Sequence, residues 1–348
     1  MTDFGFRFNS VEIAAPMVRA STLPFREECL RYGADLAFTE EVVDRKILDC
    51  ITESFTDGTV LFKTEKSDTR AVHFNPSRKN QTTIQLGTAD DIFAIKAAVK
   101  VVEYVSEVNI NMGCPKSFSI QGGMGAALLS SPERATSIVR ALRNELPRDI
   151  AVTCKIRFLG ENDHKMIERT AEFMSGLVDA GADAITVHMR TVPMRPREPA
   201  IWTSFSDLIK ALPSDHAKIP IIANGDFFTR QDIYRFRQQV DEELEGSGRG
   251  WSNSVMIARG ALYNPSIFSR QGSLPIEHVV DEFVSCCERY NEPPVAVKWT
   301  VAQMMDQTKQ FHGQPIKEFR ERIQTAKTMQ DIRASILPDI EIKKCRLE

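Results

Sequence analysis

The feature that most constrains the fold is a short run of β-branched or apolar residues that recurs eight times along the chain. A polar or glycine-containing break follows each run, and longer segments of helical periodicity, such as 89–104, 132–146 and 166–180, lie between runs. The runs are 11–15, 36–39, 83–86, 107–110, 151–156, 184–187, 220–223 and 255–258. Strands that alternate with helices pair in parallel. Eight such units predict a closed (β/α)8 TIM barrel, which typically needs about 250 residues.

Two regions depart from a minimal barrel. The runs 59–63 and 70–74 predict a small hairpin over the barrel, and the glycine-rich stretch 245–250 predicts a flexible surface loop. After residue 274 the alternation stops, and helical patterns take its place. These patterns predict three helices, at 276–290, 293–311 and 316–335. We therefore predict a barrel domain over residues 1–272 and a small C-terminal helical domain over residues 273–348.

Composition and charge exclude several classes of protein. The formal net charge is −3, so whole-molecule attraction to a polyanion is excluded and only local basic patches remain. The seven cysteines lack the spacing of a zinc site or a disulfide scaffold, which predicts reduced thiols and no metal. No apolar run reaches the roughly 18 residues of a membrane-spanning helix. The N-terminal residues do not resemble a signal peptide, so we expect a cytoplasmic protein, with a nuclear fraction left open.

Each predicted strand is followed by a polar or flexible group. In a parallel barrel the carboxyl ends of all strands open onto one face, so these groups would converge there. They are Pro16, Met17, Glu40, Gln85, Asn111, Cys114, Lys155, Arg157, His188, Arg190, Asn224, Gly225, Asp226, Arg259 and Gly260. The sequence therefore predicts one polar site at the barrel mouth.

The last two strands end in glycine turns, at 223–226 and 258–260, and a short helical piece follows at 264–269. Barrels often bind phosphate at this corner, because loop N–H groups and helix N-termini point toward the anion. Arg259 would add a bidentate cation. This corner favours a phosphate-bearing ligand.

Three residues at the mouth carry candidate chemistry. Cys114 lies between a glycine and a proline beyond the fourth strand, which favours a nucleophile or proton donor over a packing role. The glycine-rich segment 122–128 beside it predicts a flexible lid. Lys155 fits a Schiff base, a phosphate contact or a positive charge against a reduced flavin. His188 is placed to act as a hydrogen-bond donor.

Together these motifs resemble the tRNA-dihydrouridine synthase family. The resemblance covers the whole barrel and rests on APM (15–17), QLG (85–87), NMGCP (111–115), GGMGAALL (122–129), CKIR (154–157), VHMR (187–190), ANGD (223–226) and AR (258–259). The motifs NMGCPK, VTCKIR and NPSIF are similar to those of the eukaryotic type-2 branch, which reduces the uridine at position 20 of the tRNA D-loop. The resemblance implies an FMN-holding barrel followed by a helical domain that grips tRNA.

The resemblance also implies roles for individual residues. Pro16, Met17 and Val18 would line the flavin, Gln85 and Lys155 would hydrogen-bond its rings, and His188 would contact it. Its ribityl phosphate would be held by Asn224, Gly225, Asp226, Ala258 and Arg259. Cys114 would be the proton donor, and Asn111 and Arg157 would lie near the target base. NADPH is the expected reductant, hydride would reach uracil C6 from the flavin, and the thiol would protonate C5.

Two basic regions would contact tRNA phosphates. Residues 307–346 contain nine Lys and Arg residues against five Asp and Glu residues. Arg190, Arg195 and Arg197 form a second group after the sixth strand. Animal members of the type-2 branch often carry a double-stranded-RNA-binding domain after the helical region, and this chain stops at Glu348. We therefore expect either that the helical region suffices for binding or that the natural protein is longer, and we expect a monomer.

Three other functions fit parts of the pattern. A flavin barrel that acts on a free pyrimidine, as dihydroorotate dehydrogenases do, would not need the helical region. A tRNA-binding chaperone would not need Cys114. A Schiff-base lyase would use Lys155 without a flavin.

Overall fold

The computed structural model describes residues 7–306 and 321–344, and it confirms the predicted barrel. Eight parallel strands close on themselves in the order β1-β2-β6-β7-β8-β9-β10-β11. Their bounds are β1 (Glu12–Ala14), β2 (Leu36–Val43), β6 (Thr82–Gly87), β7 (Glu107–Asn111), β8 (Ala151–Phe158), β9 (Ala184–Thr191), β10 (Ile221–Asn224) and β11 (Val255–Ile257). Each of the eight predicted runs therefore contributes one barrel strand.

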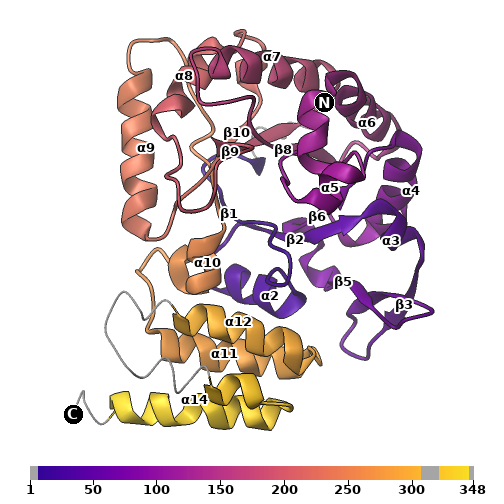
Figure 1. The fold of residues 1–348 in the computed structure, drawn as a ribbon, viewed down its shortest axis with the longest axis vertical. Coiled ribbons are helices and arrows are strands. Elements are labelled where there is room, and N and C mark those ends of the chain that lie inside the picture. The colour runs from indigo at the N-terminus through magenta and orange to yellow at the C-terminus, as the bar shows by residue number, and fades with distance from the viewer. Residues whose placement is uncertain (1–6, 307–320, 345–348) are drawn as a thin grey trace.

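Helices surround the barrel and cover its outer surface (Figure 1). They are α2 (Leu23–Arg31), α4 (Asp91–Val101), α6 (Pro132–Glu145), α7 (Met166–Asp179), α8 (Thr203–Ala211), α9 (Arg230–Leu244) and α10 (Arg259–Tyr263). The sequence sets several of their starts. Asp90 accepts a hydrogen bond from the Phe93 N–H at the start of α4, and Thr229 and Asp232 form a capping box on α9.

The predicted hairpin after β2 is a three-stranded antiparallel sheet. It consists of β3 (Cys50–Ser54), β4 (Val60–Thr64) and β5 (Arg70–Phe74), preceded by the short helix α3 (Asp44–Leu48). The sequence analysis missed β3 because most of its side chains are exposed or half-buried and include Glu53 and Ser54. Phe74 stacks on Tyr104 with ring centroids 5.4 Å apart, which fastens this sheet to the segment after α4.

In the described residues after the barrel, the regular elements are all helices. They are α11 (Ile276–Arg289), α12 (Pro294–Asp306) and α14 (Met329–Lys344), and residues 321–325 are also helical. The third predicted helix, 316–335, is therefore broken in the described part, because Asp331 accepts the N–H groups of Lys327 and Thr328, both at 2.9 Å, and starts α14 there. The parts predicted at 307–311 and 316–320 lie outside the described residues.

The C-terminal helices share their buried surface with the barrel. Val280, Phe283 and Val297 belong to the same apolar cluster as the helices around the barrel, and α11 packs on α2. Figure 1 shows α11, α12 and α14 stacked below α2 and α10. The division at residue 272 remains a prediction, but the chain does change there from alternating strands and helices to helices alone.

A group of aromatic rings supports one side of the barrel mouth. The fully buried ring of Phe236 on α9 lies 5.2 Å from Phe227, 5.3 Å from Trp202 and 5.4 Å from Phe205, measured between ring centroids. Phe227 directly follows the β10 turn, where the sequence predicts the phosphate corner. Packing of Phe236 therefore supports the backbone of that corner.

Replacing Phe236 with alanine should destabilise the protein by about 3–5 kcal/mol, because it removes a fully buried ring and leaves a cavity. Urea unfolding followed by far-UV circular dichroism measures this free energy. Ile92→Ala is the matched control, since Ile92 is 57% exposed on α4 and its loss should cost less than about 1 kcal/mol. Equal effects of the two substitutions would show that the ring cluster contributes no special stability.

Candidate active site

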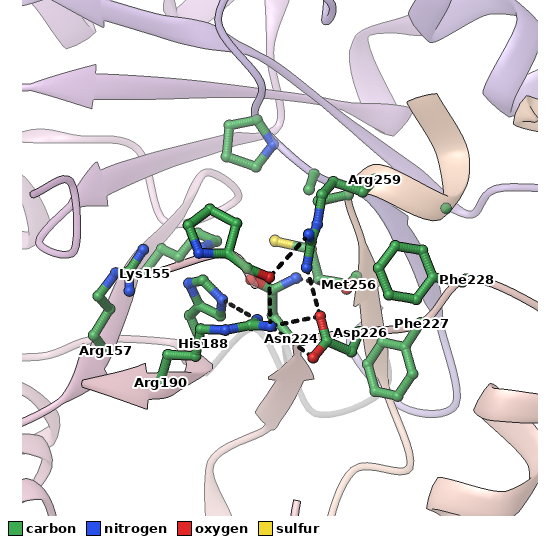
Figure 2. Close-up of a pocket in the computed structure, with 16 residues that line it drawn as sticks. Lys155, Arg157, His188, Arg190, Asn224, Asp226, Phe227, Phe228, Met256 and Arg259 are labelled. Carbon is green, nitrogen blue, oxygen red and sulfur yellow. Dashed lines mark hydrogen bonds and ion pairs between the residues drawn. The ribbon is translucent and has the colours of Figure 1, made fainter. Parts of the chain in front are cut away.

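A cavity of about 240 Å³ opens at the carboxyl ends of β8, β9, β10 and β11 (Figure 2). Eleven residues predicted for the site line it. They are Pro16, Lys155, Arg157, His188, Arg190, Asn224, Gly225, Asp226, Ala258, Arg259 and Gly260. Residues far apart in the sequence therefore meet at one rim, as the barrel requires.

The charged groups that line this cavity are mostly positive. Lys155, Arg157, Arg190 and Arg259 line it together with a single carboxylate, that of Asp226. Arg190 is almost fully buried and donates through Nη2 to both oxygens of Asp226, at 2.7 and 2.6 Å, and Arg259 donates to Asp226 Oδ1 at 2.6 Å. Figure 2 shows both guanidinium groups directed at this carboxylate. One carboxylate against four cations leaves an excess of positive charge that favours an anionic ligand.

Burial changes the protonation of two groups in the cavity. Burial, reinforced by the Arg157 charge, lowers the pKa of Lys155 to about 7. Burial also lowers the pKa of His188 well below 6.5, and the charge of Lys155 adds to this effect. His188 Nε2 lies 3.2 Å from Arg190 Nη1, so a neutral ring can accept this hydrogen bond. The histidine is therefore neutral at neutral pH, and the lysine is poised between its two forms.

The backbone of the 224–226 turn is held on both sides. Asn224 donates to the Met256 carbonyl at 2.8 Å, and the Gly225 carbonyl accepts the Trp202 indole N–H at 2.9 Å. Gly225 has φ +147°, and a Cβ there would lie 2.8 Å from Ala200 Cβ. A side chain at this position would therefore displace the turn that forms the cavity floor.

Cys114 lies on the same rim, in a loop that its neighbours hold in place. Asn111 Oδ1 accepts the N–H groups of Gly113 and Cys114, at 3.0 and 3.1 Å. Arg157 Nε donates to the Gly113 carbonyl at 2.9 Å. Gly125 has φ +58°, and a Cβ there would approach the Cys114 carbonyl oxygen to 2.7 Å. The sequence NMGC therefore builds a turn in which Asn111 positions the thiol.

The glycine-rich segment predicted as a flexible lid packs as regular structure instead. It follows the short helix α5 (Ser117–Gln121) and forms the 3₁₀ helix η3 (Gly125–Ser130), with Ala126 and Leu128 buried. The Ala126 N–H donates to the Cys114 carbonyl at 2.9 Å. Its glycines permit this close packing against the Cys114 loop.

The Cys114 thiol differs in its setting from the other described cysteines. Cys114 is half-buried, whereas Cys29, Cys50, Cys154, Cys286 and Cys287 are buried. Burial raises the pKa of Cys114, and the Glu41 carboxylate adds to the shift. The group is therefore a protonated thiol at neutral pH, which suits proton donation better than nucleophilic attack.

The remaining predicted residues lie outside the 240 Å³ cavity. Gln85 is buried and its amide donates to Asn109 at 2.9 Å, while Met17 packs against the apolar core. Arg195 and Arg197 are exposed after β9, so they separate from the buried Arg190, with which the sequence grouped them.

Val18 lines a second cavity of about 300 Å³, which the sequence analysis did not anticipate. This cavity also includes Glu40, Glu41 and Phe118. Glu40 was predicted just after a strand, but in the structure both Glu40 and Glu41 lie within β2. Glu41, and Phe227 and Phe228 in the first cavity, were not predicted from the sequence. The adjacent pair of acids was the available signal for Glu41.

Residues 13–337 match the family described as dihydrouridine synthase (Dus). The chain belongs to this family. It is 34% identical over 337 residues to a tRNA-dihydrouridine(20) synthase [NAD(P)+] of Schizosaccharomyces pombe, with 94% of this chain and 65% of that protein covered. It is 32% identical over 288 residues to the Saccharomyces cerevisiae protein of the same name, covering 79% and 70%. A Mus musculus tRNA-dihydrouridine(20a/20b) synthase [NAD(P)+]-like protein is 30% identical over 273 residues, covering 78% and 73%.

This dihydrouridine synthase chain thus spans about two thirds of the length of the fission yeast relative. Within the described ranges, no cluster of three or more His, Cys, Asp or Glu residues could hold a metal ion. A search of the same residues finds no helix that is both long and apolar enough to cross a membrane.

Lys155→Met should stabilise the ligand-free protein at pH 6, by up to about 5 kcal/mol, because charged Lys155 is desolvated in the folded state. The folded-state pKa of about 7 lies below the ordinary 10.5, so the penalty is complete below pH 7 and disappears as pH rises toward 10.5. Urea unfolding of both proteins at pH 6 and pH 9 measures the difference. A stability gap that does not shrink with pH would contradict a buried, charged lysine.

Proposed function

We propose that this chain uses FMN and NADPH to reduce a D-loop uridine of tRNA, at position 20, to 5,6-dihydrouridine. The carrying observation is that a protonated thiol, Cys114, lies on the same barrel rim as a cavity rich in cations. Membership in the dihydrouridine synthase family and the names of the relatives from the two yeasts support the reaction class.

The first cavity fits FMN by its chemistry. Its excess positive charge at Lys155, Arg190 and Arg259 suits a phosphate-bearing ligand with an electron-rich ring system. Asn224, Gly225, Asp226, Ala258 and Arg259 would hold the ribityl phosphate. Pro16, Lys155 and His188 of this cavity, together with Met17, Val18 and Gln85 from outside it, would line and hydrogen-bond the flavin rings. When bound, the flavin supplies hydride for the reduction.

Lys155 would respond to such a ligand. In the ligand-free protein its pKa is about 7 because burial and Arg157 disfavour the ammonium form. A negative charge nearby would favour that form and raise the pKa again. Lys155 therefore both attracts an anionic ligand and gains its own proton when the ligand binds.

Cys114 would provide the proton that completes the reduction. The C5=C6 bond of uracil is conjugated with the C4 carbonyl, so addition of hydride at C6 leaves enolate character that requires a proton at C5. A thiol whose pKa is raised by burial holds that proton at neutral pH. Asn111 fixes the Cys114 backbone, and we propose that Asn111 and Arg157 also lie beside the target base.

The tRNA would be gripped outside the catalytic cavity. A base enclosed in folded tRNA must be flipped out, which costs a few kcal/mol of unstacking, and phosphate contacts would offset that cost. Arg195 and Arg197 are exposed after β9 and free of the Asp226 ion pairs, so they suit phosphate contacts. The predicted basic tail, residues 307–346, lies partly outside the described residues.

Arg259→Ala should weaken FMN binding by about 10-fold or more, because it removes a charge-assisted phosphate contact worth about 1.5–3 kcal/mol. Quenching of flavin fluorescence measures the dissociation constant. Arg235→Ala is the control, since Arg235 is an exposed arginine on α9 paired with Asp232. An unchanged FMN dissociation constant in Arg259→Ala would refute the phosphate corner.

Cys114→Ala should abolish dihydrouridine formation, by at least about 100-fold, because it removes the proposed general acid. The affinities for FMN and tRNA should change little, because the loop is held by backbone contacts of Asn111 and Gly125. Mass spectrometry of tRNA from single-turnover reactions measures the product. Buried Cys154→Ala serves as a thiol control, and undiminished turnover in Cys114→Ala would refute the assigned role.

A further inference from the structure

Glu41 is a carboxylate in the second half of β2 that the mechanism above does not use. It pairs in register with Gln85 on β6, and Gly87 on the same strand leaves room for its side chain. A Cβ on Gly87 would lie 2.7 Å from Glu41 Oε1. That oxygen is buried and has no hydrogen-bond partner among the described residues. An unpaired buried carboxylate oxygen is costly, so a polar function is expected for it.

The Glu41 carboxylate lies near the Cys114 loop. Burial raises the pKa of Glu41, and interactions with the Asn111 amide and the Cys114 thiol offset part of this rise. In return, the Glu41 charge raises the pKa of Cys114. The thiol therefore has an acid–base partner on the neighbouring barrel strand.

Several cations around Cys114 oppose this effect and lower the pKa of its thiol. Lys116 follows it in the loop, and Lys155 and Arg157 interact with it from β8. Positive charges favour the thiolate, which cannot donate a proton. The Glu41 charge acts together with burial to offset these cations and keep Cys114 in its thiol form.

Glu41 also connects the thiol to water. It lines the second cavity, of about 300 Å³, whose lining includes the exposed side chains of Val18 and Phe118. The second cavity therefore gives solvent a route toward the carboxylate group. Other charged or titratable groups that line this cavity are Arg26, Glu40, Lys46, Arg70, His73 and Glu292.

We propose that Glu41 keeps Cys114 in its thiol form and returns a proton to it after each reduction. This inference rests on the proposed function, since it assumes that Cys114 is the acid. The S–H bond of Cys114 breaks as the C5–H bond of the base forms, which leaves a thiolate. The Glu41 carboxylate takes up a proton from solvent through the second cavity and passes it to the thiolate, which restores the S–H bond and returns Glu41 to its charged form. No further oxidant or reductant is needed.

Glu41→Gln tests the electrostatic half of the proposal without any need for turnover. The amide keeps the shape of the side chain but removes its charge, so the pKa of Cys114 should fall. The alkylation rate of Cys114 by iodoacetamide, measured from pH 6 to pH 10, should then rise several-fold near neutral pH, with its titration midpoint displaced to lower pH. Mass spectrometry of the tryptic peptide 101–116, which contains no other cysteine, reports Cys114 alone.

Two variants control for simple disruption. Glu40→Gln removes the adjacent carboxylate, which lines the same cavity, and should leave the alkylation midpoint of Cys114 unchanged. Glu41→Asp keeps the charge, so its alkylation midpoint should lie close to that of the wild-type protein. If Glu41→Gln leaves the midpoint in place, or if Glu40→Gln moves it equally, the assignment to Glu41 is wrong.

Measurements of turnover test whether Glu41 returns a proton to Cys114. In Glu41→Gln, the alkaline limb of the pH–rate profile for dihydrouridine formation should move to lower pH, and the rate under multiple turnover should fall more than that of the first turnover. An equal fall in both rates with no shift in pH would mean a structural role only. Failure of the proposed function gives a different result, since Cys114→Ala would then retain activity whatever the alkylation of Cys114 shows.

Discussion

Closure of the barrel by β1 against β11 is the constraint on which the site depends. Glu12 pairs with Val255 and Ala14 with Ile257 in parallel register. This seam brings together the segments that follow the two strands. Pro16 and Arg259 therefore line the same cavity. At the opposite end of the seam, Glu12 is ion-paired with Arg237 at 3.0 Å and with Arg230 on the same helix, α9. A buried carboxylate that loses such partners is strongly destabilising, so the pairs secure the closure.

The two arginines of the first cavity have a shared internal counter-ion. Asp226 holds Arg190 and Arg259 in place in the ligand-free protein, at distances of 2.6–2.7 Å. Without it, like charges would repel one another across the cavity and the side chains would disperse. With it, the guanidinium groups are already oriented, and an arriving anion needs only to share them. This preorganisation reduces the entropic cost of ligand binding.

The sequence predicts the barrel well because each strand is a local apolar run with a polar end, and such signals do not depend on distant residues. It predicts the identity of the rim residues for the same reason. What it cannot supply is side-chain direction. Arg190 and Arg195 look equivalent in sequence, yet one is buried on β9 against Asp226 and the other is exposed.

Glu41 was missed for a related reason. The setting of its side chain depends on Gly87, which lies two positions beyond its register partner Gln85. It also depends on the Cys114 loop, some seventy residues later in the chain. The third predicted helix failed differently, since the cap formed by Asp331 at Lys327 and Thr328 interrupts a pattern that is otherwise helical. Tertiary structure decides the contacts across strands, and local hydrogen bonds decide the side-chain caps. The periodicity of the sequence indicates neither.

The barrel mouth holds two groups with opposite electrostatic requirements, a cluster of cations and a protonated thiol, and the fold places them apart. The proposed anionic cofactor would require cations, which Lys155 and Arg157 would provide, but the same charges favour the thiolate form of a nearby cysteine. Cys114 stays protonated because it is half-buried in a loop held by Asn111 and because a carboxylate approaches it from β2. Cations on β8 to β11 and the acid pair on β2 thus lie on different arcs of one rim. A barrel, whose strand ends form a ring, allows opposite electrostatic demands to be met within a single site.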